Sequence, residues 1–251
     1  MPPKKVRSPI KDIHTMVSTN PNVEHAFVKT PTKKVCECSN RKEKEHTTIN
    51  REAVKKYLGE ETRNYSKIHT HPANKKFSLI PSPQDIFNLL SLSTKRSHTI
   101  YVTGKKEVLG TIHYMVKNET VAKEIFNRYT KFKKSILESK TLQEKLSSTL
   151  HKGQTLEKLY QSFTIYNTLM AKENGVKYFS TKYDTYMKEH EKTKNPNEEL
   201  FKKINFLTEN LLRNKKNLLE IWNLLGIKIR YTPNKKKGYR FDPKTIDFIK
   251  T

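Results

Sequence analysis

Two histidines one residue apart, followed by an aspartate, are the side chains in this sequence whose types and spacing best suit a metal ion. His69 and His71 end the stretch KIHTHP (67–72), and Asp85 follows in SPQD (82–85). Side chains at i and i+2 of a β-strand project to the same side, so a strand would present both imidazoles in parallel. Two imidazoles and one carboxylate can hold zinc and leave its fourth coordination position to water, which is the ligand set of a catalytic zinc site.

Such a site would provide a nucleophile at neutral pH, because zinc lowers the pKa of a bound water to about 7. Asp85 reaches the histidines only if a helix begins at Ser82 and the loop 72–81 returns its start to the strand end. Ser82 is a favourable N-cap, Pro83 suits the first turn, and an acid is favoured at position 85. In the alternative interpretation the histidines merely face solvent and Ser82 only caps a helix. The joint occurrence of H-x-H-P and S-x-x-D favours the metal site.

This combination resembles the signature of the JAMM metallopeptidases, the catalytically competent MPN-domain proteins. Their pattern is an upstream Glu, then H-[ST]-H-P, a short spacer and S-x-x-D, and the resemblance covers about residues 15–117. It implies a Zn²⁺ hydrolase that cuts a peptide or isopeptide bond, often next to ubiquitin or a ubiquitin-like protein. The spacer between His71 and Ser82 holds ten residues, which is longer than usual. We expect the insertion to change the loop and substrate access rather than the ligand geometry.

The resemblance also assigns catalytic roles to two residues. Glu24, in NVEHAFVK (22–29), stands where the upstream acid is expected and would act as general base. Ser82 would help to stabilise the oxyanion. Without the resemblance, Glu24 would be a solvated residue at a strand start. A non-catalytic MPN-like scaffold and a nucleic-acid-associated protein remain alternatives, although such scaffolds usually lack the histidines or the aspartate.

The elements around these residues predict an α+β fold. Alternation and turn residues indicate strands over 23–29, 34–38, 65–71, 98–103 and 107–116, with helices over 51–60 and from Ser82 to Leu92. The resemblance implies a mixed α/β sandwich that is MPN-like, with a cytidine-deaminase-like core. We expect this domain to span 15–118, after a basic N-terminal arm over 1–14.

The rest of the chain predicts a helical region over 119–226 and a C-terminal β-hairpin and tail over 227–251. Two apolar stripes at helical spacing indicate buried helix faces; they comprise Leu156, Leu159, Tyr160, Phe163, Tyr166 and Met170, and then Leu200, Phe201, Ile204, Leu207, Leu211 and Leu212. Gly226 is the expected C-cap of the last helix. A lid, a dimerisation arm and a docking platform are all open as roles for these helices.

The charge of the chain indicates a polyanionic partner. Fifty Lys and Arg against 25 Asp and Glu give a formal net charge of +25, which suits nucleic acid or another polyanion. The candidate nucleic-acid-binding residues are the cations of the predicted hairpin, Arg230, Lys235, Lys236, Lys237 and Arg240, with Tyr231, Tyr239 and Phe241 interleaved. In the alternative, the lysines are only solvated and the aromatic residues pack on Trp222 and Leu225.

The sequence also indicates an intracellular, cytoplasmic protein. No run of about 18 apolar residues is present, so we expect no transmembrane helix and no membrane partner. The N-terminal stretch MPPKKVRSPIKD has no apolar segment of a signal peptide. Cys36 and Cys38 are the only cysteines and form a C-x-C, which we expect to stay reduced.

Overall fold

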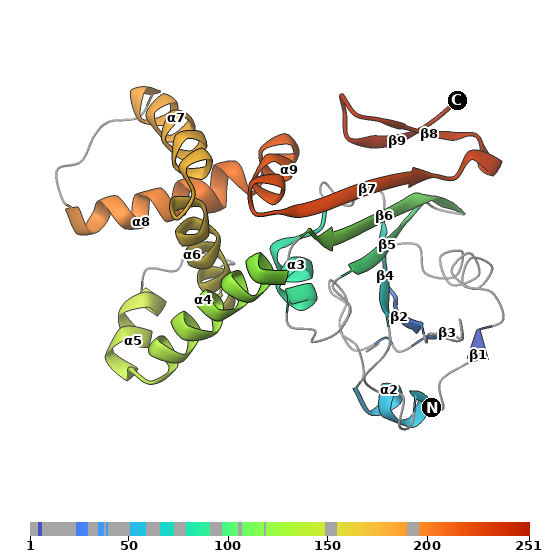
Figure 1. Cartoon of the computed structure of the whole chain (residues 1–251), viewed down its shortest axis with the longest axis horizontal. Coiled ribbons are helices and arrows are strands. Elements are labelled where there is room, and N and C mark those ends of the chain that lie inside the picture. Colours follow the sequence, from blue (N-terminus) through green and yellow to red (C-terminus); the bar gives the residue numbers. More distant parts are fainter. Residues whose placement is uncertain are drawn as a thin grey trace. The chain divides into compact units, whose positions relative to one another are not determined.

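The computed structural model describes most of the chain, in two compact units. The described residues are 5–6, 24–29, 35–37, 39, 51–58, 66–72, 79–90, 97–104, 107–117, 119–148, 155–189 and 196–251. One unit comprises Met1–Asp85, Leu92–Met115 and Ile229–Thr251, and the other comprises Ile86–Ser91 and Val116–Lys228. The first unit contains the sheet and the second contains most of the helices (Figure 1).

A seven-stranded mixed sheet is the framework of the first unit. Its strands, in spatial order, are β1 (Lys5–Val6), β3 (Val35–Glu37), β2 (Ala26–Lys29), β4 (Ser66–Pro72), β5 (Ser97–Thr103), β6 (Val108–Val116) and β7 (Ile227–Pro233). β4 and β5 run parallel, whereas β2–β4 and β5–β6 are antiparallel. A parallel pair needs a crossover connection, and α3 (Pro83–Leu90) lies in the one between β4 and β5. The predicted α+β fold class is confirmed.

The strand register places both histidines on one face of the sheet. His69 pairs with Ile100 and His71 with Val102, while Ile100 pairs in turn with Ile112 of β6. Paired residues of neighbouring strands share a face, so the two imidazoles project from the same side as these three apolar residues. Ile100, Val102 and Ile112 have no exposed surface. The two histidines therefore lie beside buried apolar residues on this face of the sheet.

Two short helices accompany the sheet strands in the sequence. α2 (Arg51–Leu58) buries Val54, and α3 buries four apolar residues, of which Ile86 and Leu89 are nearly inaccessible to solvent. α3 begins directly after Ser82, as the capping pattern predicts. This start places Asp85 in the first turn of α3.

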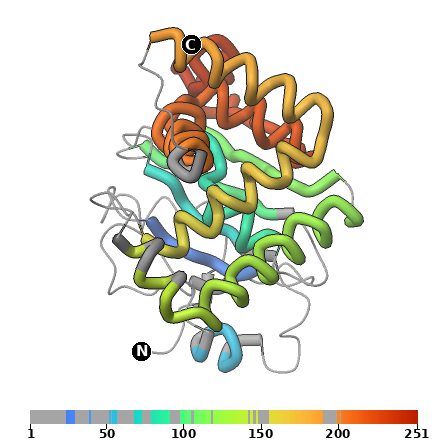
Figure 2. Tube along the Cα trace, turned by 90° about the vertical axis from the view of Figure 1, so that its left-hand side faces the viewer, coloured from blue at the N-terminus to red at the C-terminus, as the bar shows by residue number. Residues whose placement is uncertain are grey.

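The second unit is built from helices, as the apolar stripes predict. They are α4 (Glu119–Leu137), α5 (Lys140–Ser148), α6 (Leu156–Met170), α7 (Glu173–Glu189), α8 (Pro196–Phe206), the π-helical turn η2 (Leu207–Leu211) and α9 (Lys215–Leu224). α4 and α6 lie side by side (Figures 1 and 2), and Ile136 packs with Leu159, Tyr160, Phe163 and Ile204 in one core cluster. Gly226 follows α9 with a φ of 78° and caps it, as expected.

Two details of the helical unit depart from the simple stripes. Leu200 is 43% exposed, whereas Ile204 one turn later is fully buried. A new helix starts directly after the second stripe, because Asn214 has an extended backbone and its side chain accepts the Lys216 and Asn217 N–H groups. That helix, α9, carries Trp222, which has no exposed surface. In the described ranges, no helix is long and apolar enough to cross a membrane.

The chain ends in a hairpin, but its strands are not the expected ones. The sequence predicts that 227–233 pairs with the segment around Tyr239. Instead β7 joins the large sheet next to β6, and β8 (Tyr239–Asp242) pairs with β9 (Asp247–Lys250). Tyr231 stacks face to face on Phe241 at 4.0 Å, which joins β7 and β8 through side chains rather than backbone hydrogen bonds.

A close approach between the hairpin and β6 requires a glycine. A Cβ atom at Gly110 would lie 2.6 Å from the ring of Phe248 in β9. Because Gly110 pairs with Val102, which pairs with His71, this contact lies on the same sheet face as the histidines.

Candidate metal site

Strand β4 holds the two histidines through a buried threonine between them. Thr70 points to the opposite face and is fully buried. Its N–H donates to the His25 carbonyl at 2.9 Å, and its Oγ1 accepts the His25 N–H at 2.8 Å. These bonds fix the end of β4 against the chain segment that leads into β2. The side chains of His69 and His71 are only 14% and 10% exposed.

A capping box at the start of α3 holds the aspartate. The Ser82 Oγ accepts the Asp85 N–H at 3.2 Å, and the Ser82 N–H donates to Asp85 Oδ2 at 2.8 Å. This reciprocal pair satisfies two backbone donors that a helix start leaves open. The Ser82 hydroxyl also donates to Oδ2 at 2.7 Å. Oδ2 is therefore occupied, and Oδ1 is the oxygen left for another partner.

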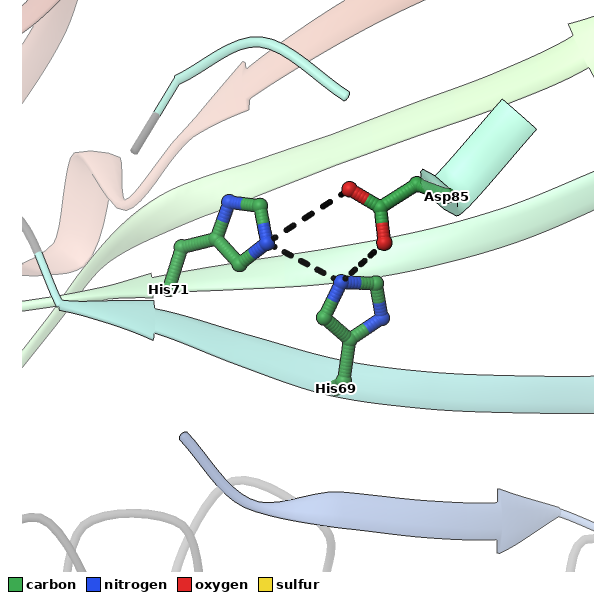
Figure 3. A group of neighbouring side chains, drawn as sticks. All are labelled: His69, His71 and Asp85. Atoms are coloured by element: carbon green, nitrogen blue, oxygen red, sulfur yellow. Dashed lines mark hydrogen bonds and ion pairs between the residues drawn. The ribbon is translucent and has the colours of Figure 1, made fainter. Parts of the chain in front are cut away.

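The three side chains converge to ligand spacing (Figure 3). His69 Nε2 lies 3.0 Å from His71 Nε2 and 3.1 Å from Asp85 Oδ1, and His71 Nε2 lies 3.8 Å from Asp85 Oδ2. In a tetrahedral site with bonds of about 2.0–2.1 Å, two ligand atoms lie about 3.3 Å apart. One candidate ligand atom from each of His69, His71 and Asp85 lies within 4.8 Å of the others, so the three residues could hold a metal ion. They form the only such group among the residues that the structure describes.

The electrostatics of the site keep Asp85 ionised. Burial by itself raises the pKa of this carboxyl group. The charge and hydrogen bond of His69, the charge of His71 and the hydrogen bond from Ser82 outweigh burial and hold the pKa well below its ordinary value. A carboxylate that is already deprotonated can bind a cation without first releasing a proton.

Glu24 precedes β2, the strand that pairs with β4. Ala26 pairs with His69 in the antiparallel β2–β4 pair, and the hydrogen bonds between His25 and Thr70 extend this pairing by one residue. Continued by one further residue, this register would set Glu24 opposite His71. Directly opposed residues share a face, with Cβ atoms about 5 Å apart. In that register the half-buried Glu24 would share the face of the histidines.

Ser82 is brought to the site in a way that limits its chemistry. Its one hydroxyl proton is donated to Asp85 Oδ2, and a lone pair accepts the Asp85 N–H. In this arrangement the hydroxyl has no second proton for a substrate oxygen. The geometry supports orientation of the metal ligand as the task of Ser82.

A buried histidine–tyrosine pair that no sequence pattern indicates lies near the site. The Tyr114 hydroxyl lies 3.2 Å from His98 Nδ1, and both residues are buried. Burial raises the pKa of Tyr114 well above its ordinary value, and the negative charge of Asp85 adds to this effect. His98 has no ligand spacing in the sequence, and only the β5–β6 register, in which His98 pairs with Tyr114, reveals the pair.

The five cations proposed for nucleic-acid binding do not lie on one surface. Arg230 alternates with Tyr231 on β7, and Arg240 alternates with Phe241 on β8. Because Tyr231 and Phe241 stack on each other, the two arginines point away from that stack on opposite sides. Lys235, Lys236 and Lys237 form the 3₁₀ turn η3 between these strands and are exposed. Cys38, the second residue of the C-x-C, lies outside the described residues.

Comparison of the chain with models of protein families, with curated protein sequences and with solved structures found no match. The function proposed below is therefore supported by the geometry of the candidate metal site and by the resemblance of its sequence pattern.

Proposed function

We propose that this chain is a zinc-dependent hydrolase that cleaves a peptide or isopeptide bond, with chemistry of the JAMM type. The observation that carries the proposal is the convergence of His69, His71 and Asp85 into a group that could hold a metal ion. Conjugates of ubiquitin-like proteins are the substrates that the resemblance favours. The bond class and the substrate both follow from the resemblance, and the geometry is compatible with them.

Zinc is the metal that the donor set favours. Two imidazole nitrogens and one carboxylate oxygen suit zinc, whereas Mg²⁺ and Ca²⁺ prefer sites made of oxygen ligands. The ligand atoms are mostly buried, and three protein ligands leave one tetrahedral position for water or substrate. When bound, zinc supplies a Lewis acid for the substrate carbonyl and an acidified water molecule.

The side chains of the protein would carry out proton transfer, metal ligation and positioning. The Glu24 carboxylate takes a proton from the attacking water and hands it to the departing amine, so one residue serves first as base and then as acid. Asp85 supplies a negative charge through Oδ1, and Ser82 holds that carboxylate through Oδ2. Thr70 keeps β4 in register with the segment that carries Glu24.

Metal analysis of purified variants tests the proposal most directly. We expect about one zinc per chain in the wild type and in His113→Ala, and loss of zinc in His71→Ala. His113 is a matched control because it pairs with Thr99, which lies on the opposite sheet face. Equal zinc content in all three proteins would contradict the assignment of His71 as a zinc ligand.

An activity assay separates a hydrolase from a non-catalytic scaffold with the same site. The zinc-loaded protein is incubated with isopeptide-linked ubiquitin dimers and with a mixed peptide library, and the products are read by mass spectrometry. We expect cleavage that a chelator abolishes and added zinc restores. A protein that binds zinc tightly but cleaves neither probe would favour the scaffold.

A further inference from the structure

The turn η3, which contains Lys235–Lys237, is held in place by hydrogen bonds within the first unit. Asn234 donates its N–H to the Leu109 carbonyl and its side-chain amide to the Val108 carbonyl, each at 2.9 Å. Gly238 ends the turn with a φ of 73°, and the Thr251 N–H and hydroxyl both donate to the Gly238 carbonyl. Hydrogen bonds to β6 and to the C-terminus therefore fix the place of Lys235–Lys237.

The three lysines of this turn are not neutralised by acids in the described part of the chain. None of them forms an ion pair with a described residue, and all three are exposed. Glu107, the acid that anchors the hairpin, accepts the Tyr239 hydroxyl at 2.8 Å and lies 4.0 Å from Lys250 Nζ. Three adjacent like charges on a fixed turn create a local positive potential that favours an anionic partner.

The turn lies at the same end of the sheet as the candidate metal site. His71 pairs with Val102, Val102 pairs with Gly110, and the neighbouring Leu109 accepts the hydrogen bond from Asn234. The hairpin that follows the turn packs through Phe248 on the Gly110 side, which is the face of the histidines. Three strand spacings of about 4.8 Å give a lateral distance of about 14 Å between the backbones of β4 and β7. An extended peptide covers that distance in about four residues.

The aromatic residues near the turn argue for an acidic peptide rather than a nucleic acid. Single-stranded nucleic acids bind where aromatic faces are free to stack with bases. Here Tyr231 and Phe241 stack on each other at 4.0 Å, and the Phe248 ring lies against both of them. These faces are already used inside the protein. Tyr239, which follows the turn, donates its hydroxyl to Glu107 and has Lys250 Nζ over its ring. The three lysines of the turn supply positive charge, which matches the side chains of Asp and Glu.

We propose that Lys235, Lys236 and Lys237 form a subsite for an acidic segment of the substrate, about four residues from the bond that is cleaved. The role as a substrate subsite rests on the proposed function, whereas the affinity for acidic peptide does not. Arg230 is not part of this subsite because it lies beside His113 on the other sheet face, where burial and then the Arg230 charge lower the pKa of His113.

A binding experiment tests the subsite without relying on catalysis. Fluorescence anisotropy measures the affinity of labelled hexaglutamate and of labelled hexathymidylate for the full chain, both zinc-loaded and chelator-treated. The test variant carries Lys235→Gln, Lys236→Gln and Lys237→Gln. The control variant carries Lys123→Gln, Lys177→Gln and Lys188→Gln, which removes the same charge from exposed positions on the helices α4 and α7.

We expect the turn variant to bind hexaglutamate about tenfold more weakly than the control variant, since each exposed ion pair contributes a modest share. The loss should be the same with and without zinc, so a failure of the metal site would not be mistaken for a failure of the subsite. Equal affinities of the two variants would overturn the proposal. Tighter wild-type binding of hexathymidylate, lost in the turn variant, would also overturn it and indicate nucleic acid.

The position of the subsite is tested with a peptide library and the zinc-loaded wild type. Cleaved peptides should be enriched in Asp and Glu about four residues from the cut, and the turn variant should lose this enrichment. Cleavage without any acidic preference would overturn the role in substrate selection.

Discussion

Asp85 is held from both sides, by His69 at Oδ1 and by Ser82 at Oδ2. We predict that Ser82→Ala lowers zinc affinity by about tenfold or more, because hydrogen bonds to a ligating carboxylate orient it for the metal. Ser82→Thr keeps the hydroxyl and should restore most of the affinity. Competition with a chromophoric chelator measures both values. Unchanged zinc affinity together with reduced turnover in Ser82→Ala would instead support a direct contact of the hydroxyl with the substrate.

Glu24 is the residue that we propose as general base. We predict that Glu24→Gln retains zinc and loses hydrolysis by a factor on the order of 10²–10⁴, since an amide cannot accept the proton of the attacking water. Glu173→Gln, at an exposed position in the first turn of α7, is the control. The comparison needs only initial rates and metal content. A Glu24→Gln enzyme of normal rate would assign the base to another residue.

At the scale of elements, the contact of β9 with β6 depends on a missing side chain. We predict that Gly110→Ala destabilises the protein by roughly 1–3 kcal/mol, because the added methyl group overlaps the Phe248 ring. Phe248→Leu in the same chain should recover part of this loss by vacating the space. Urea denaturation followed by circular dichroism gives the free energies of unfolding. Additive losses in the double variant would show that the two residues are not in contact.

The elements that the sequence predicts well are those fixed by local chemistry. The start of α3 could be read from Ser82 and Asp85, because a capping box needs only neighbours in sequence. The parallel projection of His69 and His71 could be read in the same way, from the period of a strand. Convergence of these two elements followed only from the resemblance and from an assumed return of the loop.

The partner of β7 could not be predicted because it depends on distant residues. The segment 227–233 is adjacent in sequence to a turn and a second strand, so a local hairpin is the simplest expectation. The Asn234 side chain instead bonds to Val108, 126 positions away, and Gly110 makes room for Phe248. Neither contact leaves a pattern within a short window of sequence. The same holds for the pairing of His98 with Tyr114.

For the whole molecule, we expect the net charge of +25 to lower the stability of the folded state. Like charges repel in the compact state, and salt screens this repulsion with a Debye length of about 8 Å at physiological ionic strength. We predict that the thermal unfolding midpoint rises when sodium chloride is increased from a few millimolar to physiological levels. Differential scanning calorimetry measures the shift. A midpoint that falls over this range would mean that attractive ion pairs, such as Lys133–Glu157, outweigh the repulsion.

The position of the single tryptophan has a practical consequence. Trp222 is the only tryptophan of the chain and is fully buried in α9, within the helical unit, whereas the ligand residues belong to the other unit. Indole emission excited at its red edge therefore monitors the solvent exposure of the helical unit alone. The molecule thus carries an intrinsic optical probe that needs no label. With it, chemical denaturation can show whether zinc protects the unit that binds it or the entire chain.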